Sequence, residues 1–368
     1  MLTPEQLARD LAIRDLTDPA EGDHAIQRLI ELAADALAGR WGCTVRVARG
    51  PRVVSRADNY DRLRFDAGDV TRDARYTRYV DGDRLLRSHS SAMIPPALRA
   101  LAADPVDDVL LVCPGIVFRR DAIDRLHSGT PHQLDLWRIT RRPMAIDDLD
   151  EMIGALAGAL VPGLPVRAEG RVHPYTLEGR QVDVRAGDEW VEVWECGLAH
   201  PEVLAGAGLE GWSGLALGMG LDRLLMLRCD IPDIRLLRST DPRVADQLVE
   251  LQPYRPVSDL PAVRRDLSVA VDADDDAEDL GDRVRDALGD DADAIEAVEV
   301  LSATAHDDLP ESARARLGLE PSQKNLLLRL VLRPFDRTLT DAEANELRDR
   351  VYAALHQGAV MTWAVDSR

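Results

Sequence analysis

The sequence predicts an α+β protein with two domains, and three features of the chain support this. Its 368 residues exceed what one ordinary domain needs, and 45% of them are hydrophobic, enough to fill a sizeable core. Helix-like and strand-like patterns are mixed along the first two thirds of the chain. Beyond about residue 252 the pattern follows the order β-α-β-β-α-β, a split βαβ arrangement. We therefore place the domains at residues 1–252 and 253–368, where Pro242, Pro253 and Pro256 interrupt the pattern.

The elements of the first domain follow from hydrophobic periodicity. Apolar residues at helical spacing predict the helices His24–Arg40, Pro95–Ala103, Ile146–Leu160 and Leu215–Arg228. Short apolar runs bounded by turn residues predict the strands Thr44–Val47, Val109–Val112, Ile116–Phe118, Leu134–Ile139 and Trp190–Val193. Residues 55–88 are rich in Arg, Asp and Tyr and predict irregular structure.

The second domain gives the clearer pattern, and its order is that of a ferredoxin-like fold. We predict strands at Leu267–Val271, Val298–Ser302, Asn325–Leu332 and Met361–Val365, and helices at Asp276–Leu288 and Asp341–His356. The acidic run Asp272–Asp279 is interpreted as a solvated loop leading into a helix, because carboxylates are favoured near helix N-termini.

Composition excludes several classes of protein. The chain has 45 basic and 65 acidic side chains, a net charge of −20, so it does not wrap nucleic acid by bulk charge. A salt-loving host is an alternative source of this acidity. Four cysteines without a CxxC pair argue against a disulfide framework or a zinc knuckle. No apolar run approaches the ~20 residues of a membrane span, and no signal peptide is visible. We expect no membrane partner and a cytoplasmic location.

The segment 116–137 predicts a ligand site. A strand ends at Arg119, a polar loop follows, and the chain returns through His132 and Asp135. Such a β-hairpin holds an arginine, a histidine and a carboxylate around one anionic ligand, and the arginine fork suits phosphate. The alternative is a surface hairpin with ordinary ion pairs.

Two further segments carry candidate binding residues. In the segment 214–227, Gly218 and Gly220 permit a close approach by a ligand and Arg223 follows, although a tightly packed core helix with an exposed arginine gives the same pattern. Near residue 90, His89 and Ser91 place small polar groups between apolar flanks. They suit a substrate carboxylate or amine, or alternatively a turn in which serines bond their own backbone.

Together these segments resemble motifs 2 and 3 of the class II aminoacyl-tRNA synthetases, in the form found in the catalytic subunit of the phenylalanyl enzymes. The family patterns read approximately YRxDxxDxTHxxxFHQxEG and GFAFGxGxER. Further matches are Gly50-Pro51, Asn59-Tyr60-Asp61, Cys196-Gly197-Leu198-Ala199-His200-Pro201 and Ile231-Pro232-Asp233 in the first domain, and Tyr254-Arg255-Pro256, Arg264-Arg265-Asp266-Leu267 and Asp336-Arg337-Thr338 in the second. The resemblance covers roughly residues 22–362. It implies an antiparallel sheet flanked by helices, plus a ferredoxin-like anticodon-binding module on the same chain, as in the single-chain organellar enzymes.

The resemblance also implies a reaction with ATP and Mg²⁺. An amino acid carboxylate attacks the α-phosphate of ATP, and positive charge stabilises the charge that develops there. By position, the implied roles are α-phosphate contact for Arg119, γ-phosphate contact for Arg223, phosphate contact for His127, amino-group binding for Gln133 and Asp135, amino acid contact for His89 and Ser91, and flanking of substrate and adenine for Ala216 and Gly218. Glu192 is the expected Mg²⁺ ligand, with a structural ion pair as the alternative.

The chain departs from the family where the amino acid side chain binds. The family segment FPFTEPS is replaced by one in which His173 and Tyr175 stand for the two ring-gripping phenylalanines. A buried polar atom without a partner costs ~1–3 kcal/mol, so these residues favour a substrate with a polar group. Trp194 and Glu195 replace small residues and are expected to narrow or recharge the site; the alternative is that both point away into the core or solvent. Pro131 replaces the phenylalanine that stacks on adenine.

Three functional readings follow. The first is a phenylalanine–tRNA ligase-like enzyme that activates phenylalanine or a polar aromatic analogue and charges tRNA. The second is a paralogue that adenylates another amino acid for a non-tRNA acceptor, because residues 251–368 carry 14 basic and 25 acidic side chains, which weakens the case for tRNA. The third, a non-enzymatic amino acid sensor, is disfavoured because it has no use for Arg119 and Arg223. The oligomeric state stays open.

Overall fold

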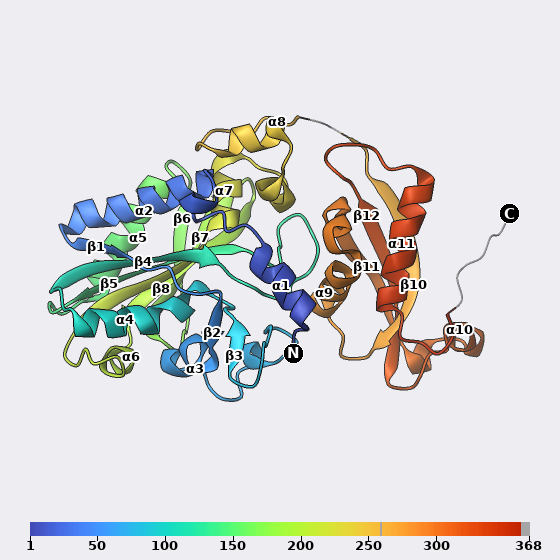
Figure 1. Ribbon diagram of the computed structural model, residues 1–368, viewed down its shortest axis with the longest axis horizontal. Helices are drawn as coiled ribbons and strands as arrows, with labels where there is room; N and C mark the ends of the chain where they lie inside the picture. Colours follow the sequence, from blue (N-terminus) through green and yellow to red (C-terminus); the bar gives the residue numbers. More distant parts are fainter. Residues whose placement is uncertain (258–259, 362–368) are drawn as a thin grey trace. The chain divides into compact units, whose positions relative to one another are not determined.

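The computed structural model describes residues 1–257 and 260–361, which form two compact units of mixed α and β structure (Figure 1). The first unit comprises Met1–Arg119 with Thr130–Arg255, and the second comprises Arg120–Gly129 with the residues from Pro256 onward. The α+β fold class is confirmed. The predicted boundary after residue 252 stays a prediction.

The first unit is built on a seven-stranded sheet with the strand order β1-β4-β5-β9-β8-β7-β6. Its strands are β1 (Thr44–Val47), β4 (Asp108–Ile116), β5 (His132–Thr140), β6 (Val166–Gly170), β7 (Thr176–Ala186), β8 (Glu189–Ala199) and β9 (Ser213–Gly220). A separate two-stranded sheet pairs β2 (Val53–Ser55) with β3 (Arg84–Leu86). All neighbours in the large sheet are antiparallel except β1 and β4, which are parallel.

Helices cover both faces of this sheet. The helices of the first unit are α1 (Pro4–Ala12), α2 (Ala25–Trp41), α3 (Arg56–Asn59), α4 (Ile94–Ala103), α5 (Ile146–Leu160), α6 (Pro201–Ala205), α7 (Leu221–Cys229) and α8 (Pro242–Ala245). Figure 1 shows α2 and α5 over one face and α4 and α6 over the other. On the α4 face, Leu111, Trp137 and Leu98 belong to one buried apolar cluster, which gives that face its core.

Local sequence explains where the main helix begins and ends. The Nδ1 atom of His24 accepts a hydrogen bond from the backbone N–H of Ile26 at 3.2 Å and so caps the first turn of α2. Gly42 ends the helix in the left-handed conformation, with φ of 63°, which costs glycine little. The predicted helices His24–Arg40, Pro95–Ala103 and Ile146–Leu160 are confirmed to within one residue at either end.

Two predictions in this unit were wrong. The predicted strands on either side of Pro114 and Gly115 are one strand, β4, that runs through both residues. Its pairing with β1 ends at Val112, so the N–H that proline lacks is not needed on that side. The predicted helix Leu215–Arg228 is strand β9 up to Gly220 and helix only from Leu221. Pairing with β5 and β8 outweighs the local helical pattern.

The second unit is a three-stranded antiparallel sheet in the order β10-β12-β11, packed against two helices. Its elements are β10 (Val263–Asp272), α9 (Ala277–Leu288), β11 (Ile295–Ala305), α10 (Glu311–Leu317), β12 (Gln323–Leu332) and α11 (Asp341–Leu355). Five predicted elements are confirmed, α10 was missed, and the predicted strand Met361–Val365 lies outside the described residues apart from Met361. Ile123 is buried in the core of this unit.

Candidate active site

Three neighbouring strands place two carboxylates on one face of the sheet. Asp135 of β5 pairs with Gly218 of β9, and Gly218 pairs in turn with Glu195 of β8. Directly paired residues point to the same side of a sheet. Asp135 and Glu195 therefore lie on the same face, two strand spacings or ~10 Å apart at their backbones. Gly218 has no side chain, so nothing on β9 fills the span between them at this position.

Asp135 is a buried carboxylate held only by neutral donors. It accepts hydrogen bonds from the Ser90 hydroxyl, from Ser91 Oγ at 3.1 Å and from Trp137 Nε1 at 3.0 Å. It is 1% exposed, and burial raises its pKa to about 6 against the opposing effect of these three donors. Within the described part of the chain no salt bridge to Asp135 is found. Such a carboxylate favours a cationic ligand, because an added positive charge offsets its burial.

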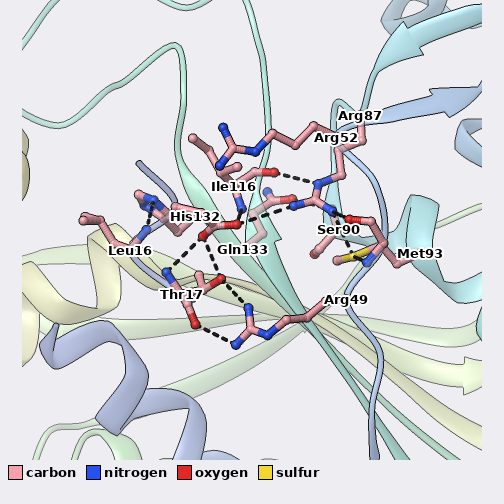
Figure 2. Close-up of polar contacts among 12 residues, drawn as sticks. Leu16, Thr17, Arg49, Arg52, Arg87, Ser90, Met93, Ile116, His132 and Gln133 are labelled. Atoms are coloured by element: carbon pink, nitrogen blue, oxygen red, sulfur yellow. Dashed lines mark hydrogen bonds and ion pairs between the residues drawn. The ribbon is translucent and has the colours of Figure 1, made fainter. Parts of the chain in front are cut away.

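Ser90 and Ser91 reach Asp135 because a short 3-10 helix, Ser90–Met93, leads into α4. The backbone N–H of Ser90 donates to Gln133 Oε1 at 3.1 Å, so Gln133 of β5 fixes the start of this turn (Figure 2). Both predicted amino-group residues and Ser91 thus belong to one hydrogen-bonded group. The sequence-based alternative, in which the serines bond only their own backbone, does not hold for Ser91.

Arg87, a buried arginine near this hydrogen-bonded group, was not singled out from the sequence. Arg87 donates to the carbonyl oxygen of Ile116 at 2.7 Å and to that of Gly50 at 2.9 Å, and it lies 3.7 Å from the Asp15 carboxylate (Figure 2). A Cβ atom at Gly115 would overlap the guanidinium group of Arg87. In the sequence, the glycine at position 115 was the one feature that pointed to this close approach of Arg87. The network ties an N-terminal segment to the strand that precedes Arg119.

His132 was expected beside an anionic ligand, and this expectation was wrong. Its side chain is 0% exposed and lies within the protein. Nε2 accepts from the backbone N–H of Leu16 at 3.2 Å and lies 3.1 Å from a guanidinium nitrogen of Arg238, so the ring proton is on Nδ1. Nδ1 then donates to Asp222 at 2.9 Å. This pair joins the start of β5 to the first turn of α7, beside Arg223.

The predicted phosphate-binding residues fall into both units. Arg119 follows β4, is half-buried and donates from Nε to the carbonyl oxygen of Ser88 at 2.9 Å. Arg223 lies in the first turn of α7 and is half-buried. His127 is assigned to the second unit, where its Nδ1 lies 2.7 Å from Asp124. Arg119 and Arg223 therefore belong to the first unit and His127 to the second.

Four aromatic rings follow one another beside Asp135. His89 stacks on Phe65 at 5.5 Å between centroids, Phe65 contacts Tyr175 at 6.1 Å, and Tyr175 stacks on His173 at 6.0 Å. Burial lowers the pKa of His89 to about 3, and the charge of Arg119 acts in the same direction. Burial raises the pKa of Tyr175, as do the carboxylates of Asp135 and Glu195. Tyr175 is thus electrostatically coupled to both carboxylates of the sheet face.

His173 and Glu195 form a close pair at the far end of this row. His173 Nε2 lies 3.1 Å from Glu195 Oε2, near enough for an ion pair, but their alignment does not make a hydrogen bond. Burial raises the pKa of Glu195, but His173, Arg171 and Arg119 outweigh it and hold the pKa below its usual value. Trp194 is 1% exposed and, by strand alternation, points to the opposite face, so it does not narrow this site.

The remaining predicted residues lie on the same strands. Ala216 of β9 pairs with Trp137 and is buried in the apolar cluster of the α4 face. Glu192 of β8 is half-buried, and its pKa is raised by burial and by Glu195 against the opposing charge of Arg223. Among the described residues no group of three or more His, Cys, Asp or Glu side chains could hold a metal alone. A cation at Glu192 needs further oxygen ligands from a substrate or water.

Two family descriptions match this chain. The family described as "tRNA synthetases class II core domain (F)" matches residues 10–248, and "Ferredoxin-fold anticodon binding domain" matches residues 258–362.

Curated relatives carry consistent names. A phenylalanine–tRNA ligase alpha subunit of Prochlorococcus marinus (strain MIT 9313) is 36% identical over 63% of this chain and 69% of its own length. A probable mitochondrial phenylalanine–tRNA ligase of Drosophila melanogaster is 27% identical over 82% of this chain and 75% of its own length. A chloroplastic/mitochondrial phenylalanine–tRNA ligase of Arabidopsis thaliana is 28% identical over 81% of this chain and 68% of its own length.

Proposed function

The chain belongs to the family of class II tRNA synthetase core domains, and on this premise we propose that it activates an amino acid with ATP and transfers it to tRNA. The proposal is a phenylalanine–tRNA ligase-like activity, with phenylalanine or a polar aromatic analogue as the amino acid. Support comes from the family match over residues 10–248, from the names of the relatives and from the anticodon-binding domain behind the core.

One observation carries the amino acid site. Asp135 is a buried carboxylate with three neutral donors and, among the described residues, no cationic partner. The α-ammonium group of an amino acid supplies the missing positive charge, and the interaction is a charge-assisted hydrogen bond. Gln133, which holds Ser90, positions the same group. The substrate's carboxylate then remains available for reaction.

The two arginines of the first unit supply the electrostatic part of the mechanism. An oxygen of the substrate carboxylate attacks the α-phosphorus of ATP, the bond to the bridging oxygen breaks, and pyrophosphate leaves with the electron pair. Arg119 contacts the α-phosphate and Arg223 the γ-phosphate, where fixed positive charge lowers the barrier. His127 is proposed as a further phosphate contact.

Magnesium fits the acidic residues of β8. Glu192 and Glu195 are close enough for the charge of one to raise the pKa of the other, and carboxylate oxygens are the donors that Mg²⁺ prefers. We propose that Glu192 would hold the Mg²⁺ ion when it is bound. The ion supplies charge neutralisation at the phosphates.

The acceptor and the location complete the proposal. The match to an anticodon-binding domain favours tRNA, and no finding supports the alternative of a non-tRNA acceptor. The helices of the described residues include none long and apolar enough to cross a membrane. The cytoplasmic location stays a prediction, since the relatives of Drosophila and Arabidopsis carry organellar names.

The test measures amino acid-dependent ATP–pyrophosphate exchange and tRNA charging by the full chain at low and high KCl. We expect both activities, and a loss of ~100-fold or more in exchange for Arg119→Ala. Arg84→Ala is the matched control, because its exposed side chain forms an ion pair with Asp81. Exchange that is absent with every amino acid, or equal in the two variants, contradicts the proposal.

A further inference from the structure

The row of aromatic rings ends at a polar pair that the reaction with ATP does not use. His173 is 8% exposed, and its Nε2 is buried without a hydrogen-bond partner among the described residues. Its Nδ1 lies 3.2 Å from Thr176 Oγ1, which fixes the ring. Glu195 keeps its charge beside this ring, with 28% of its side chain exposed. Glu195 also lies 3.5 Å from Arg171. The buried Nε2 atom of His173, which makes no hydrogen bond to any described residue, is costly unless a ligand completes it.

The pairing of the strands places His173 and Glu195 where the side chain of a substrate bound at Asp135 would reach them. Asp135 and Glu195 lie on one face on either side of Gly218, ~10 Å apart at their backbones. Tyr175 stacks on Trp137, which donates a hydrogen bond to Asp135. It also stacks on His173, which lies beside Glu195, so the Tyr175 ring lies between the two ends. This step rests on the proposed function: a substrate whose ammonium contacts Asp135 extends its side chain along Tyr175 toward Glu195.

The chemistry along this path selects the class of side chain. The centroid of the Tyr175 ring lies 6.1 Å from that of Phe65 and 5.9 Å from that of Trp137. These rings favour an aromatic side chain. An ionised carboxylate only accepts hydrogen bonds, and neutral histidine has one accepting nitrogen. The end of the path is therefore complementary to a hydrogen-bond donor on an aromatic ring.

We propose that His173 and Glu195 are specificity-determining residues, and that the site takes an aromatic amino acid whose ring carries a hydroxyl or amino group in preference to phenylalanine. An unsubstituted ring buries the Glu195 carboxylate without replacing its water. A site built to hydrogen-bond a substrate group rejects the analogue that lacks the group far more strongly than a hydrophobic site rejects an added one.

The experiment compares four probes with the full chain: L-phenylalanine, L-tyrosine, L-meta-tyrosine and 4-amino-L-phenylalanine. Each is assayed by pyrophosphate exchange for kcat/KM, and by its shift of the thermal unfolding midpoint, which needs no turnover. We expect at least one substituted probe to exceed phenylalanine by about tenfold or more in kcat/KM. Equal or better activity with phenylalanine overturns this inference and leaves the proposed function intact. If no probe and no other amino acid supports activity, both this inference and the proposed function are overturned.

Two variants assign the preference to the pair. Glu195→Gln keeps the shape and removes the charge, and His173→Phe keeps a ring in the stack and removes both nitrogens. We expect each to reduce the preference for the substituted ring by about tenfold. Glu189→Gln, exposed on the same strand, is the control and should leave the preference unchanged. Preferences that stay unchanged in Glu195→Gln and His173→Phe overturn the assignment, and Glu195→Gln still tests it if the histidine variant fails to fold.

Discussion

Replacing Asp135 by asparagine tests the amino acid site most directly. The substitution keeps the shape of the side chain, and its amide oxygen still accepts from Trp137 while its NH₂ group donates to the hydroxyls of Ser90 and Ser91. The lost element is the negative charge that pairs with the substrate ammonium. Hydrogen bonds to charged groups contribute ~1.5–3 kcal/mol, which converts to a ~10- to 150-fold loss of kcat/KM for the amino acid. The KM for ATP should change little.

The pH dependence gives the same variant a second signature. Burial raises the pKa of Asp135 to about 6, so the amino acid affinity of the unaltered chain should fall as the pH drops below that value. Asp135→Asn should remove this acidic limb from the pH profile of the amino acid KM.

The stability of the free protein gives the Asp135→Asn variant a third signature. Here the substitution is expected to bring a gain, whereas it weakens amino acid binding. The pKa of Asp135 is about 6 in the folded state and 3.8 in the unfolded state. The contribution of this carboxyl group to folding stability is therefore fully present below pH 3.8 and is lost as the pH rises through about 6. Buried ionised Asp135 therefore costs the free protein up to ~3 kcal/mol at neutral pH. Relative to the unaltered chain, Asp135→Asn should gain more thermal stability at about pH 8 than at about pH 5. An unchanged KM, a retained acidic limb or a pH-independent stability difference would refute the assignment of the charge to Asp135.

Three further substitutions test other parts of the site. Arg223→Ala should lower pyrophosphate exchange by ~100-fold or more, while the exposed Arg84→Ala leaves it unchanged; equal rates would contradict the phosphate contact. Glu192→Gln should raise the Mg²⁺ concentration needed for half-maximal exchange, and an unaltered Mg²⁺ titration would remove it as a ligand. Arg87→Met should lower the free energy of unfolding in urea by ~3–5 kcal/mol, because it leaves the Asp15 carboxylate buried without its cation; a loss below ~1 kcal/mol would show that the network is not a stabilising one.

Helices with a strong apolar stripe and good ends were predictable from the sequence. α5 was predicted with both ends correct, since Leu149, Met152, Leu156 and Leu160 recur on one face at helical spacing. The stretch Leu215–Gly220 misled the prediction because glycine and small apolar residues satisfy a helical and an extended period equally. Only pairing with β5 and β8, which are distant in the sequence, makes it a strand.

The residues of the candidate site also fall into those that the sequence predicts and those that only the structure places. Arg119, Gln133, Asp135 and Arg223 were predicted from the sequence because their spacing within short segments matches a family pattern. His132 lies between two of these residues in the chain, yet it is fully buried and bonded to Asp222. No local pattern distinguishes it, because its partner is 90 residues away.

The sequence by itself determined which side chains are present and in what order: two arginines that we propose for phosphate, a carboxylate that we propose for an ammonium group, and polar residues where a hydrophobic side chain was expected. Only the tertiary structure decided which of them face one another. Strand register set Asp135 and Glu195 on one face across Gly218 and turned Trp194 to the other. The physical reason is the two-residue period of a strand, in which a shift of one position in pairing exchanges the faces, and long-range packing alone fixes that position.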